Sequence, residues 1–243
     1  MKPKQDRVAL VTGASGGIGA AVCAALADGG FKLALHYSSN AAGARALAEK
    51  LGRERCALIK ADLSKPGAAK PVVDACLRAF GRLDLLVNNA GAVLGDKDFM
   101  FASESDWERT FRLNAFSPFF LSREAFRAMK GHGGRIVNIS SIAAKFGGSA
   151  RSMHYGAAKA AVEAMTVSLA RLGAPDILVN AVRPGVIDTD FHGKFKKNMR
   201  ARVEMIPLKR MGTATDVAAM VAFLAGPGGD FITGQVFSVS GGE

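Results

Sequence analysis

The chain has 243 residues, of which 49% are hydrophobic and 7% aromatic, and its formal net charge is +11 at pH 7. This length suits one large domain or two small ones, and no apolar run approaches the roughly 20 residues that span a bilayer. The stretch 1–7 lacks the apolar segment and cleavage site of a signal peptide. We therefore expect a single cytoplasmic domain with no membrane partner.

The cysteines and histidines give no sign of a metal site. Cys23, Cys56 and Cys76 are odd in number and none belongs to a CxxC pair, which argues against a disulfide framework or a zinc site. The histidines, at positions 36, 132, 154 and 192, lack the spacing of metal ligands. We expect buried thiols, a reducing compartment and no metal.

Positive charge is densest in the segment 194–202. A nucleic-acid-binding surface would interleave aromatic residues with basic ones or carry a recognition motif. Neither is present, so we expect no nucleic-acid partner. The segment is interpreted as a solvated basic helix or as part of a flap that attracts an anionic cofactor and substrate.

Short apolar runs alternate with helix-length segments along the chain. The runs predict buried strands at Val8–Val11, Phe31–Leu35, Ala57–Ile59, Leu83–Val87, Ile136–Ile139, Ile177–Ala181 and Val236–Val239. Helices are expected at Gly17–Asp28, Ala41–Leu51, Pro66–Phe80, His154–Leu172 and Thr215–Leu224. The alternation predicts an α/β fold, a Rossmann-like doubly wound parallel sheet of about seven strands with helices on both faces and ligands at the carboxyl ends of the strands.

A glycine-rich turn, Thr12–Gly19, follows the first predicted strand. Gly13 permits a tight turn, Gly17 a close approach of the backbone to a pyrophosphate, and Gly19 close packing of the helix. The free N–H groups of the helix start suit phosphate. The spacing is G-x-x-x-G-x-G rather than the commoner G-x-G-x-x-G, and glycines also mark ordinary loops. The predicted dinucleotide contacts of this turn are Gly13, Ser15, Gly17, Ile18 and Gly19.

The segment after the second predicted strand, His36–Asn40, contains no acid. NAD sites commonly use Asp or Glu here to bind the ribose hydroxyls, and a carboxylate would repel a 2′-phosphate. Hydroxyl and basic side chains that could accept the phosphate are Tyr37, Ser38, Ser39, Arg45 and Lys32. We predict that NADP(H) is preferred, and NAD(H) stays possible because Gly16 supplies no basic group.

The next two strand ends supply further candidates. Asp62, followed by Leu63, could hold the adenine edge or could cap a helix, and both interpretations stay open. Asn88–Gly91 ends the fourth predicted strand, although its composition alone indicates only a turn. The residues of that segment expected to border the cofactor are Asn89, Ala90 and Gly91.

Tyr155 and Lys159 lie four residues apart on one predicted helix and therefore share a face. An ammonium near a phenol favours the phenolate and lowers its pKa from about 10, which suits proton exchange with a carbonyl oxygen or an alcohol. Ser141, at the end of the fifth strand, could hold the same oxygen. Asn114 could anchor a water near Lys159.

These motifs together resemble the short-chain dehydrogenase/reductase family, in its compact single-domain form, over essentially the whole chain. The resemblance implies that Tyr155 is the general acid/base, that Ser141 orients the substrate oxygen, and that Lys159 lowers the tyrosine pKa and bonds the nicotinamide ribose. It implies that Asn114 holds a proton-relay water. The residues it places along the nicotinamide are Pro184, Gly185, Ile187 and Thr189.

The resemblance also implies a homotetramer, with interfaces on helices around Asp106–Lys130 and His154–Leu172 and on the last strand. The apolar run Phe116–Leu121 is compatible with an interface and equally with the core. One spacing departs from the family: 13 residues before Tyr155 stands Ile142 rather than a serine. We take Ser141 as the functional serine, with Ser140 as the alternative, and assign the extra residue to the loop 145–153, where it could alter specificity.

We expect a flap near 190–207 to cover a small-molecule carbonyl or alcohol substrate. Its apolar and basic residues suit an acyl chain on an anionic carrier or another hydrophobic ketone, and equally a solvated helix. His154 could point into the pocket or support packing. The predicted activity is NADP(H)-preferring interconversion of a carbonyl and a secondary alcohol. The alternatives are an NAD-dependent alcohol, sugar or steroid dehydrogenase of the same family, or a non-catalytic nucleotide-binding regulator.

Overall fold

The computed structural model describes residues 7–95, 97–189 and 199–243. Over these residues one parallel sheet of seven strands runs in the order β3-β2-β1-β4-β5-β6-β7. The strands are β1 (Val8–Val11), β2 (Lys32–Tyr37), β3 (Cys56–Lys60), β4 (Leu85–Asn88), β5 (Gly134–Ile139), β6 (Ile177–Pro184) and β7 (Val236–Val239). The order reverses between β1 and β4, which is the position where doubly wound sheets bind ligands.

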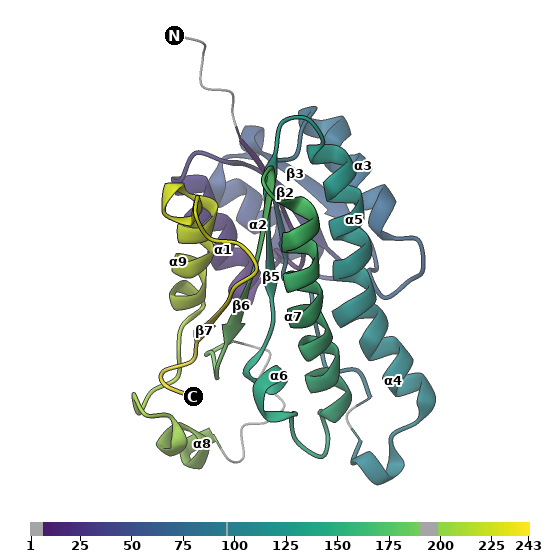
Figure 1. The fold of residues 1–243 in the computed structure, drawn as a ribbon, viewed down its shortest axis with the longest axis vertical. Helices are drawn as coiled ribbons and strands as arrows, with labels where there is room; N and C mark the ends of the chain where they lie inside the picture. Colours follow the sequence, from purple (N-terminus) through teal and green to yellow (C-terminus); the bar gives the residue numbers. More distant parts are fainter. Residues whose placement is uncertain (1–6, 96, 190–198) are drawn as a thin grey trace.

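Helices cover both faces of the sheet (Figure 1). The helices are α1 (Gly17–Asp28), α2 (Ala41–Leu51), α3 (Ala69–Phe80), α4 (Glu104–Phe111), α5 (Ser117–Met129), α6 (Ile142–Phe146), α7 (Met153–Gly173), α8 (Met199–Met205) and α9 (Ala214–Ala225). A π-helical turn, η3 (Arg112–Phe116), joins α4 to α5, and short 3₁₀ turns occur at Arg53–Arg55, Phe99–Phe101 and Pro227–Gly229.

The core has two layers, one on each face of the sheet. Side chains of α1, α2 and α9 pack on one face around Leu33 and Val87. Side chains of α3, α5 and α7 pack on the other around Leu10 and Ile136. Because consecutive strand residues point to opposite faces, Leu10 lies in the second layer while its neighbours Ala9 and Val11 lie in the first. This alternation explains why the strands read as unbroken apolar runs.

The predicted fold class and all seven predicted strands are confirmed; β1 and β7 have the predicted bounds, and the ends of the other five differ by at most three residues. The helices α1 and α2 have the predicted bounds. The predicted helix at Pro66 begins instead at Ala69, after a turn at Gly67 with a positive φ of 78°. The last helix is capped by Thr213, whose hydroxyl accepts from the Asp216 N–H, and not by the predicted Thr215.

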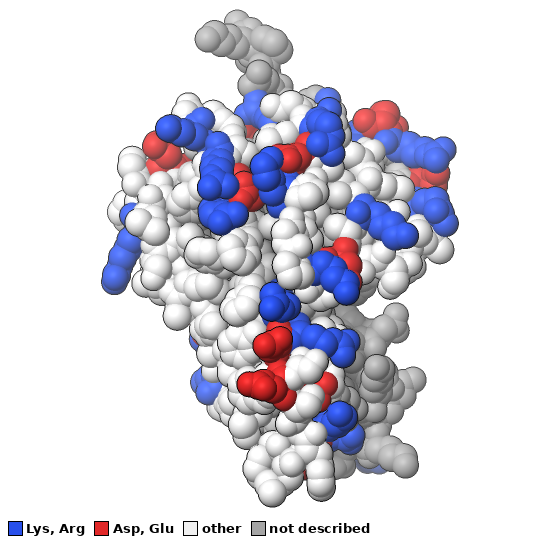
Figure 2. Space-filling view, turned by 90° about the vertical axis from the view of Figure 1, so that its right-hand side faces the viewer, with Lys and Arg blue, Asp and Glu red and all other residues white. Residues whose placement is uncertain are grey.

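Within the described ranges, no helix is both long and apolar enough to cross a membrane. The same residues contain no cluster of three or more His, Cys, Asp or Glu side chains that could hold a metal ion. On the face shown in Figure 2, Lys and Arg side chains are scattered over the surface and several adjoin Asp or Glu. Positive charge on this face is therefore dispersed, without a continuous stripe.

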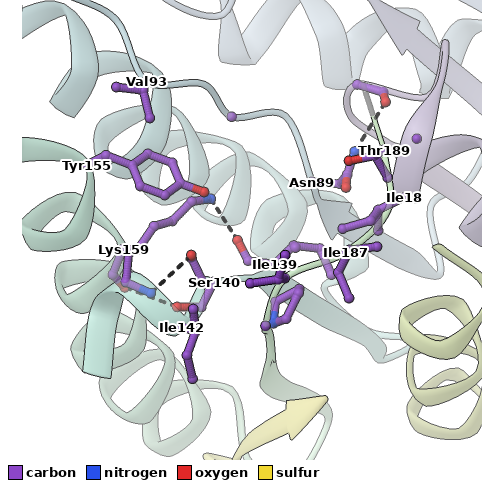
Figure 3. Close-up of a pocket in the computed structure, with 18 of the residues that line it drawn as sticks. Ile18, Asn89, Val93, Ile139, Ser140, Ile142, Tyr155, Lys159, Ile187 and Thr189 are labelled. Carbon is purple, nitrogen blue, oxygen red and sulfur yellow. Dashed lines mark hydrogen bonds between the residues drawn. The ribbon is translucent and has the colours of Figure 1, made fainter. Parts of the chain in front are cut away.

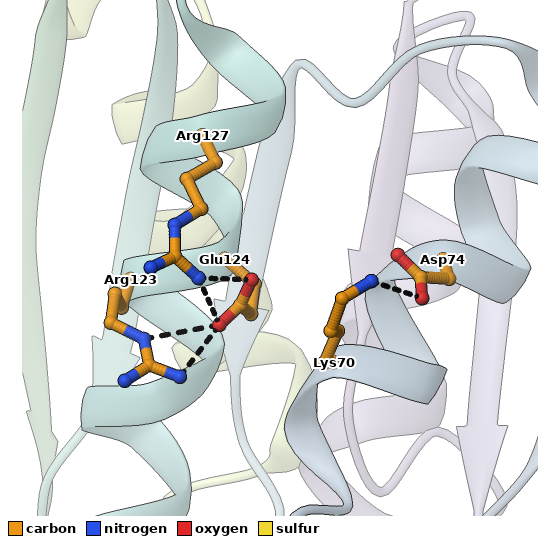
Figure 4. A network of polar contacts seen from close by, with 5 residues as sticks. All are labelled: Lys70, Asp74, Arg123, Glu124 and Arg127. Carbon is orange, nitrogen blue, oxygen red and sulfur yellow. Dashed lines mark hydrogen bonds and ion pairs between the residues drawn. The ribbon is translucent and has the colours of Figure 1, made fainter.

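The outer helix α5 combines exposed aromatic rings with a buried carboxylate. Phe116, Phe119 and Phe120 are exposed on or beside it. Glu124 is buried and accepts hydrogen bonds of 2.8 to 3.0 Å from Arg123 and Arg127 (Figure 4). The two guanidinium groups hold the pKa of Glu124 below its usual value, against the effect of burial.

Candidate active site

The glycine-rich turn after β1 is tied to the end of β4 by hydrogen bonds of the Thr12 and Asn89 side chains. The Thr12 hydroxyl accepts hydrogen bonds of 2.9 Å from the backbone N–H groups of Asn89 and Ala90. The Asn89 amide donates to the carbonyl oxygens of Thr12, at 2.8 Å, and Gly13, at 3.1 Å. These contacts hold the ends of β1 and β4 together at the point where the strand order reverses.

The glycines of the turn meet different physical requirements. Gly13 and Gly17 have φ values of +66° and +54°, in the left-handed region that favours glycine. A Cβ at Gly19 would collide with the Gly13 carbonyl, so Gly19 lets α1 pack against the turn. Gly16 has an extended φ of 175° and open space where a Cβ would stand. The turn thus forms a cradle at a helix start, which fits the phosphates of a dinucleotide.

The end of β2 is also tied to this turn. Asn40 caps α2 by accepting from the Gly43 N–H at 2.9 Å, and its amide donates to the Ser15 carbonyl at 3.1 Å. His36 is buried and bonded to Gly13. Ser38 and Ser39 are exposed beyond it.

Asp62 does not cap a helix. Its carboxylate accepts hydrogen bonds from the backbone N–H of Ser64 at 3.0 Å and from the Ser64 hydroxyl at 2.6 Å. The Ser64 contacts lower the pKa of Asp62. The helix-cap interpretation is therefore wrong, because α3 begins seven residues later, at Ala69.

Tyr155 and Lys159 are buried on the first turns of α7, and Figure 3 shows both side chains at the cavity. The Tyr155 side chain is hydrogen-bonded to Ser141, which also caps α6 by accepting from the Ala143 N–H at 3.2 Å. Lys159 donates to the Ile139 carbonyl at 2.8 Å, and its Nζ lies 5.7 Å from the centre of the Tyr155 ring. A phenol, a hydroxyl and an ammonium are thus brought together.

The predicted lowering of the Tyr155 pKa is wrong for this structure. Burial raises the pKa of Tyr155 to about 12, and the Ser141 hydrogen bond opposes this rise only in part. Burial also lowers the pKa of Lys159 to about 8. The spacing of Tyr155 and Lys159 predicts that they share a helix face, but it does not reveal how completely the phenol and the ammonium are buried.

Asn114 lies in the π-helical turn η3 and is fully buried. Its amide donates at 2.8 Å to the carbonyls of Ala92 and Thr110, and its Oδ1 accepts from the Ala92 N–H at 3.2 Å. A Cβ at Gly91 would lie 2.7 Å from the Asn114 Oδ1 and 3.2 Å from the Lys159 Nζ. The absence of a side chain at Gly91 therefore lets Asn114 and Lys159 come close. π-Helical turns of this kind often mark functional sites.

A network of polar side chains that the sequence does not predict lies next to Ser141. The Ser140 hydroxyl donates to Glu163 at 2.7 Å, and Arg183 donates to the same carboxylate at 2.8 and 2.6 Å. Ser140 is therefore occupied away from Tyr155, which favours Ser141 as the functional serine. The ion pair spans α7 and β6, and no local motif could have indicated it.

One cavity of about 790 Å³ joins these groups. Most predicted site residues line it, namely Gly13, Ser15, Gly17, Ile18, Asn89, Ala90, Gly91, Ser141, Tyr155, Lys159, Pro184, Gly185, Ile187 and Thr189. Those absent from its lining are Gly19, Tyr37, Ser38, Ser39, Asp62, Leu63 and Asn114. Gly19 packs against Gly13, and Asn114 bonds the backbone of Ala92, so both support residues of the lining or its neighbours. The others lie at or beyond the ends of β2 and β3.

The rest of the lining comes from residues that the motifs did not single out. These include Val93, Ile142, Ser149, Ser152, Met199 and Arg202. His154 is excluded, because it is buried and its Nε2 bonds the Leu94 carbonyl at 2.8 Å. Of the expected flap, positions 190–198 lie outside the described residues. The helix α8 supplies Met199 and Arg202 to the cavity.

A nucleotide cradle joined to a buried tyrosine and lysine at the switch point of a doubly wound sheet defines the dinucleotide-dependent oxidoreductases. Comparisons with known proteins agree. The family model described as Enoyl-(Acyl carrier protein) reductase matches residues 13–243. A short-chain type dehydrogenase/reductase of Picea abies is 41% identical, with 98% of this chain and 92% of the relative covered. The 3-oxoacyl-(acyl-carrier-protein) reductase FabG of Vibrio cholerae is 36% identical, with 98% and 97% covered.

Solved structures show the same likeness. A short chain dehydrogenase from Burkholderia cenocepacia in complex with NADP is 37% identical and superposes with a TM-score of 0.92, covering 100% of this chain and 99% of that one. The chain belongs to the short-chain dehydrogenase/reductase family. It is an NAD(P)-dependent oxidoreductase that binds a nicotinamide cofactor.

Proposed function

We propose that this protein is an NADP(H)-preferring reductase that interconverts a carbonyl and a secondary alcohol. The observation that carries the proposal is that Ser141, Tyr155 and Lys159 line the same cavity as the glycine-rich turn. A non-catalytic nucleotide-binding regulator would not require all three of these groups. The Tyr155 phenol, the Ser141 hydroxyl and the Lys159 ammonium lie together at the end of the cavity where the nicotinamide of a dinucleotide would bind.

The nicotinamide, when bound, supplies or accepts the hydride. In the direction of reduction, Ser141 donates a hydrogen bond to the substrate carbonyl oxygen and Tyr155 transfers a proton to it. The ammonium of Lys159 stabilises the tyrosinate that forms. Because burial raises the pKa of Tyr155 to about 12, this cation is needed to make the proton transfer favourable near neutral pH. Asn114 holds the backbone of Ala92, next to Gly91, which lies against Lys159, and would anchor a relay water there.

The preference for NADP(H) rests on the end of β2, where His36–Asn40 contains no carboxylate to repel a 2′-phosphate. Ser38 and Ser39 are exposed there and can donate hydrogen bonds to it. Arg45 is exposed on the first turns of α2 and can supply a cation. The Burkholderia cenocepacia relative was solved with NADP.

The substrate half of the cavity combines apolar side chains with a cation. Val93, Ile142 and Met199 line it together with Arg202. This lining suits a hydrophobic ketone, including the 3-oxoacyl thioester of an anionic carrier, the chemistry named for the Vibrio cholerae relative. An NAD-dependent alcohol, sugar or steroid dehydrogenase is the alternative within the family.

We further propose a cytoplasmic homotetramer. The exposed rings of Phe116, Phe119 and Phe120 provide an apolar face on α5, and Phe231 is fully exposed before β7. The three cysteines are free thiols, which suits a reducing compartment. Size-exclusion chromatography with light scattering tests the assembly, and a monomer at micromolar concentration would contradict it.

The cofactor proposal is tested by thermal-shift titration with NADPH, with NADH and without cofactor. We expect NADPH to raise the melting temperature more at equal concentration. A carbonyl screen with NADPH then tests the activity. Stronger stabilisation by NADH would overturn the cofactor preference. A response to neither cofactor would favour the non-catalytic regulator.

A further inference from the structure

We propose that His36 is a positioning residue for the dinucleotide-binding turn: through its ring it holds the Gly13 backbone in the conformation that receives the phosphates. This inference rests on the proposed use of the turn as a nucleotide cradle. His36 does not line the cavity and belongs to none of the glycine, tyrosine or asparagine motifs.

The imidazole of His36 bridges three strand ends. Its Nδ1 accepts a hydrogen bond from the Gly13 N–H at 3.2 Å, after β1. Its Nε2 lies 3.1 Å from the carbonyl of Ala61, after β3. The His36 carbonyl accepts from the Ala14 N–H at 2.8 Å. The ring is buried, so water does not replace these contacts.

The two partners select one tautomer of the ring. A backbone N–H can only donate and a backbone carbonyl can only accept. Nδ1 must therefore carry the lone pair and Nε2 the proton, so the ring must be neutral. Burial lowers the pKa of His36 to about 4, although the Ala61 carbonyl and the charge of Asp62 act in the opposite direction. At neutral pH the imidazole is in the required state.

The position of Gly13 explains why this bond matters for the cofactor. Gly13 turns the chain with a φ of +66° and lines the cavity. From the β4 side, Asn89 holds its carbonyl oxygen. From the β2 side, His36 holds its N–H. With both groups occupied, and with the Ala14 N–H held by the His36 carbonyl, the peptide units around Gly13 are clamped. The N–H groups at the start of α1 then stay directed toward the phosphate position.

Three substitutions separate the two ring contacts. His36→Asn places a carboxamide oxygen where Nδ1 stands, so it keeps an acceptor for Gly13. His36→Gln places its amide near the Nε2 position, where it can donate to Ala61 but leaves the Gly13 N–H without an acceptor. His36→Leu keeps approximate volume and removes both contacts.

The test measures the NADPH dissociation constant by fluorescence titration at pH 7.5 for these proteins. We expect an increase of about tenfold for His36→Leu and His36→Gln, since a buried donor loses its partner, and a change below about threefold for His36→Asn. His132→Asn is the matched control. His132 also bonds a backbone carbonyl, that of Leu83 at 3.1 Å, but at the amino ends of the strands. It should bind NADPH like the wild type.

Rescue by asparagine separates positioning from packing. Equal NADPH dissociation constants for the glutamine and asparagine variants would overturn the proposal. It would also be overturned if all variants bound NADPH like the wild type and differed only in melting temperature, because His36 would then only fill the core. Should the leucine variant fail to fold, the comparison of asparagine with glutamine decides alone. Wild-type protein that binds neither NADPH nor NADH would instead overturn the proposed function itself.

Discussion

The two walls of the cavity are built in different ways. The cofactor wall consists of strand ends joined by hydrogen bonds to the backbone, made by Thr12, His36 and Asn89. The substrate wall consists of short elements, α6 with five residues and α8 with seven. Backbone-directed bonds depend little on which ligand is bound, whereas side chains on short helices can be exchanged without disturbing the sheet. One wall is therefore suited to a constant cofactor and the other to a variable substrate.

The substrate wall nevertheless has its own anchor. Arg202 of α8, which lines the cavity, forms an ion pair with the buried side chain of Glu243. Gly241 and Gly242 have positive φ values, and a Cβ at either would lie 2.8 Å from a side-chain carbon of Ile206 or Pro207. The segment after β7 thus packs closely against the end of α8. Substitutions on either wall, and at the tyrosine and lysine where the two meet, test whether the walls act independently.

The largest effect is expected where the walls meet. Tyr155→Phe removes the proton donor but keeps the ring in place. We expect turnover to fall about 10²- to 10⁴-fold, the range that general acid–base catalysis contributes, with the NADPH dissociation constant within about threefold of wild type. Steady-state kinetics and fluorescence titration measure the two quantities. His132→Asn, which lies outside the cavity lining at the amino ends of the strands, is the control. Undiminished turnover in Tyr155→Phe would refute the mechanism.

Lys159 should make the stability of the cofactor-free protein depend on pH. Its pKa is about 8 when folded and 10.5 ordinarily, so between these values the unfolded chain holds a proton that the folded chain has released. Stability therefore rises with pH across this window, and the full penalty applies below pH 8. We expect the wild type to gain about 3 kcal/mol relative to Lys159→Met between pH 7 and 10.5, at about 1.4 kcal/mol per pKa unit. Urea unfolding at both pH values measures it, and a constant difference would contradict it.

A matched pair of glycines tests the cofactor wall. Gly19→Ala drives a Cβ into the Gly13 carbonyl, whereas Gly16→Ala meets open space. We expect Gly19→Ala to lose about 1–3 kcal/mol of stability through overpacking and to bind NADPH about tenfold more weakly. Gly16→Ala should stay within about 0.5 kcal/mol. Thermal unfolding and fluorescence titration compare them. Equal behaviour of the two variants would mean that close helix packing is not needed here.

The smallest effect is expected on the substrate wall. Glu243→Gln weakens the ion pair that holds α8, so we expect KM for the carbonyl substrate to rise about three- to tenfold while kcat and NADPH affinity stay unchanged. A partly exposed ion pair contributes little energy, which sets this modest size. Glu49→Gln, which weakens the exposed pair with Arg53, is the control. A change in NADPH affinity instead would show that the walls are not independent.

The glycine-rich turn of the cofactor wall could be predicted from the sequence for a physical reason. Glycines that need a positive φ, such as Gly13, and apolar runs that need burial leave local signals. The contact of His36 with Gly13 joins residues 23 apart, and that of Lys159 with Ile139 joins residues 20 apart. No local pattern encodes such partners. The degree of burial that raises the Tyr155 pKa likewise emerges only from packing. The flap expected near 190–207 did point to the region from which α8 supplies Met199 and Arg202.

The strand order has a consequence for folding. β1 pairs with β4, so the hydrogen bond between Thr12 and Asn89 closes a loop of 77 residues. The cavity draws its lining from residues between 13 and 202. A chain emerging from the ribosome would expose its nucleotide turn long before α7 supplies the tyrosine, and loops of this length close slowly. During folding, nucleotide affinity and turnover should therefore both appear only in the last cooperative step. Fluorescence of the bound cofactor would then report complete folding.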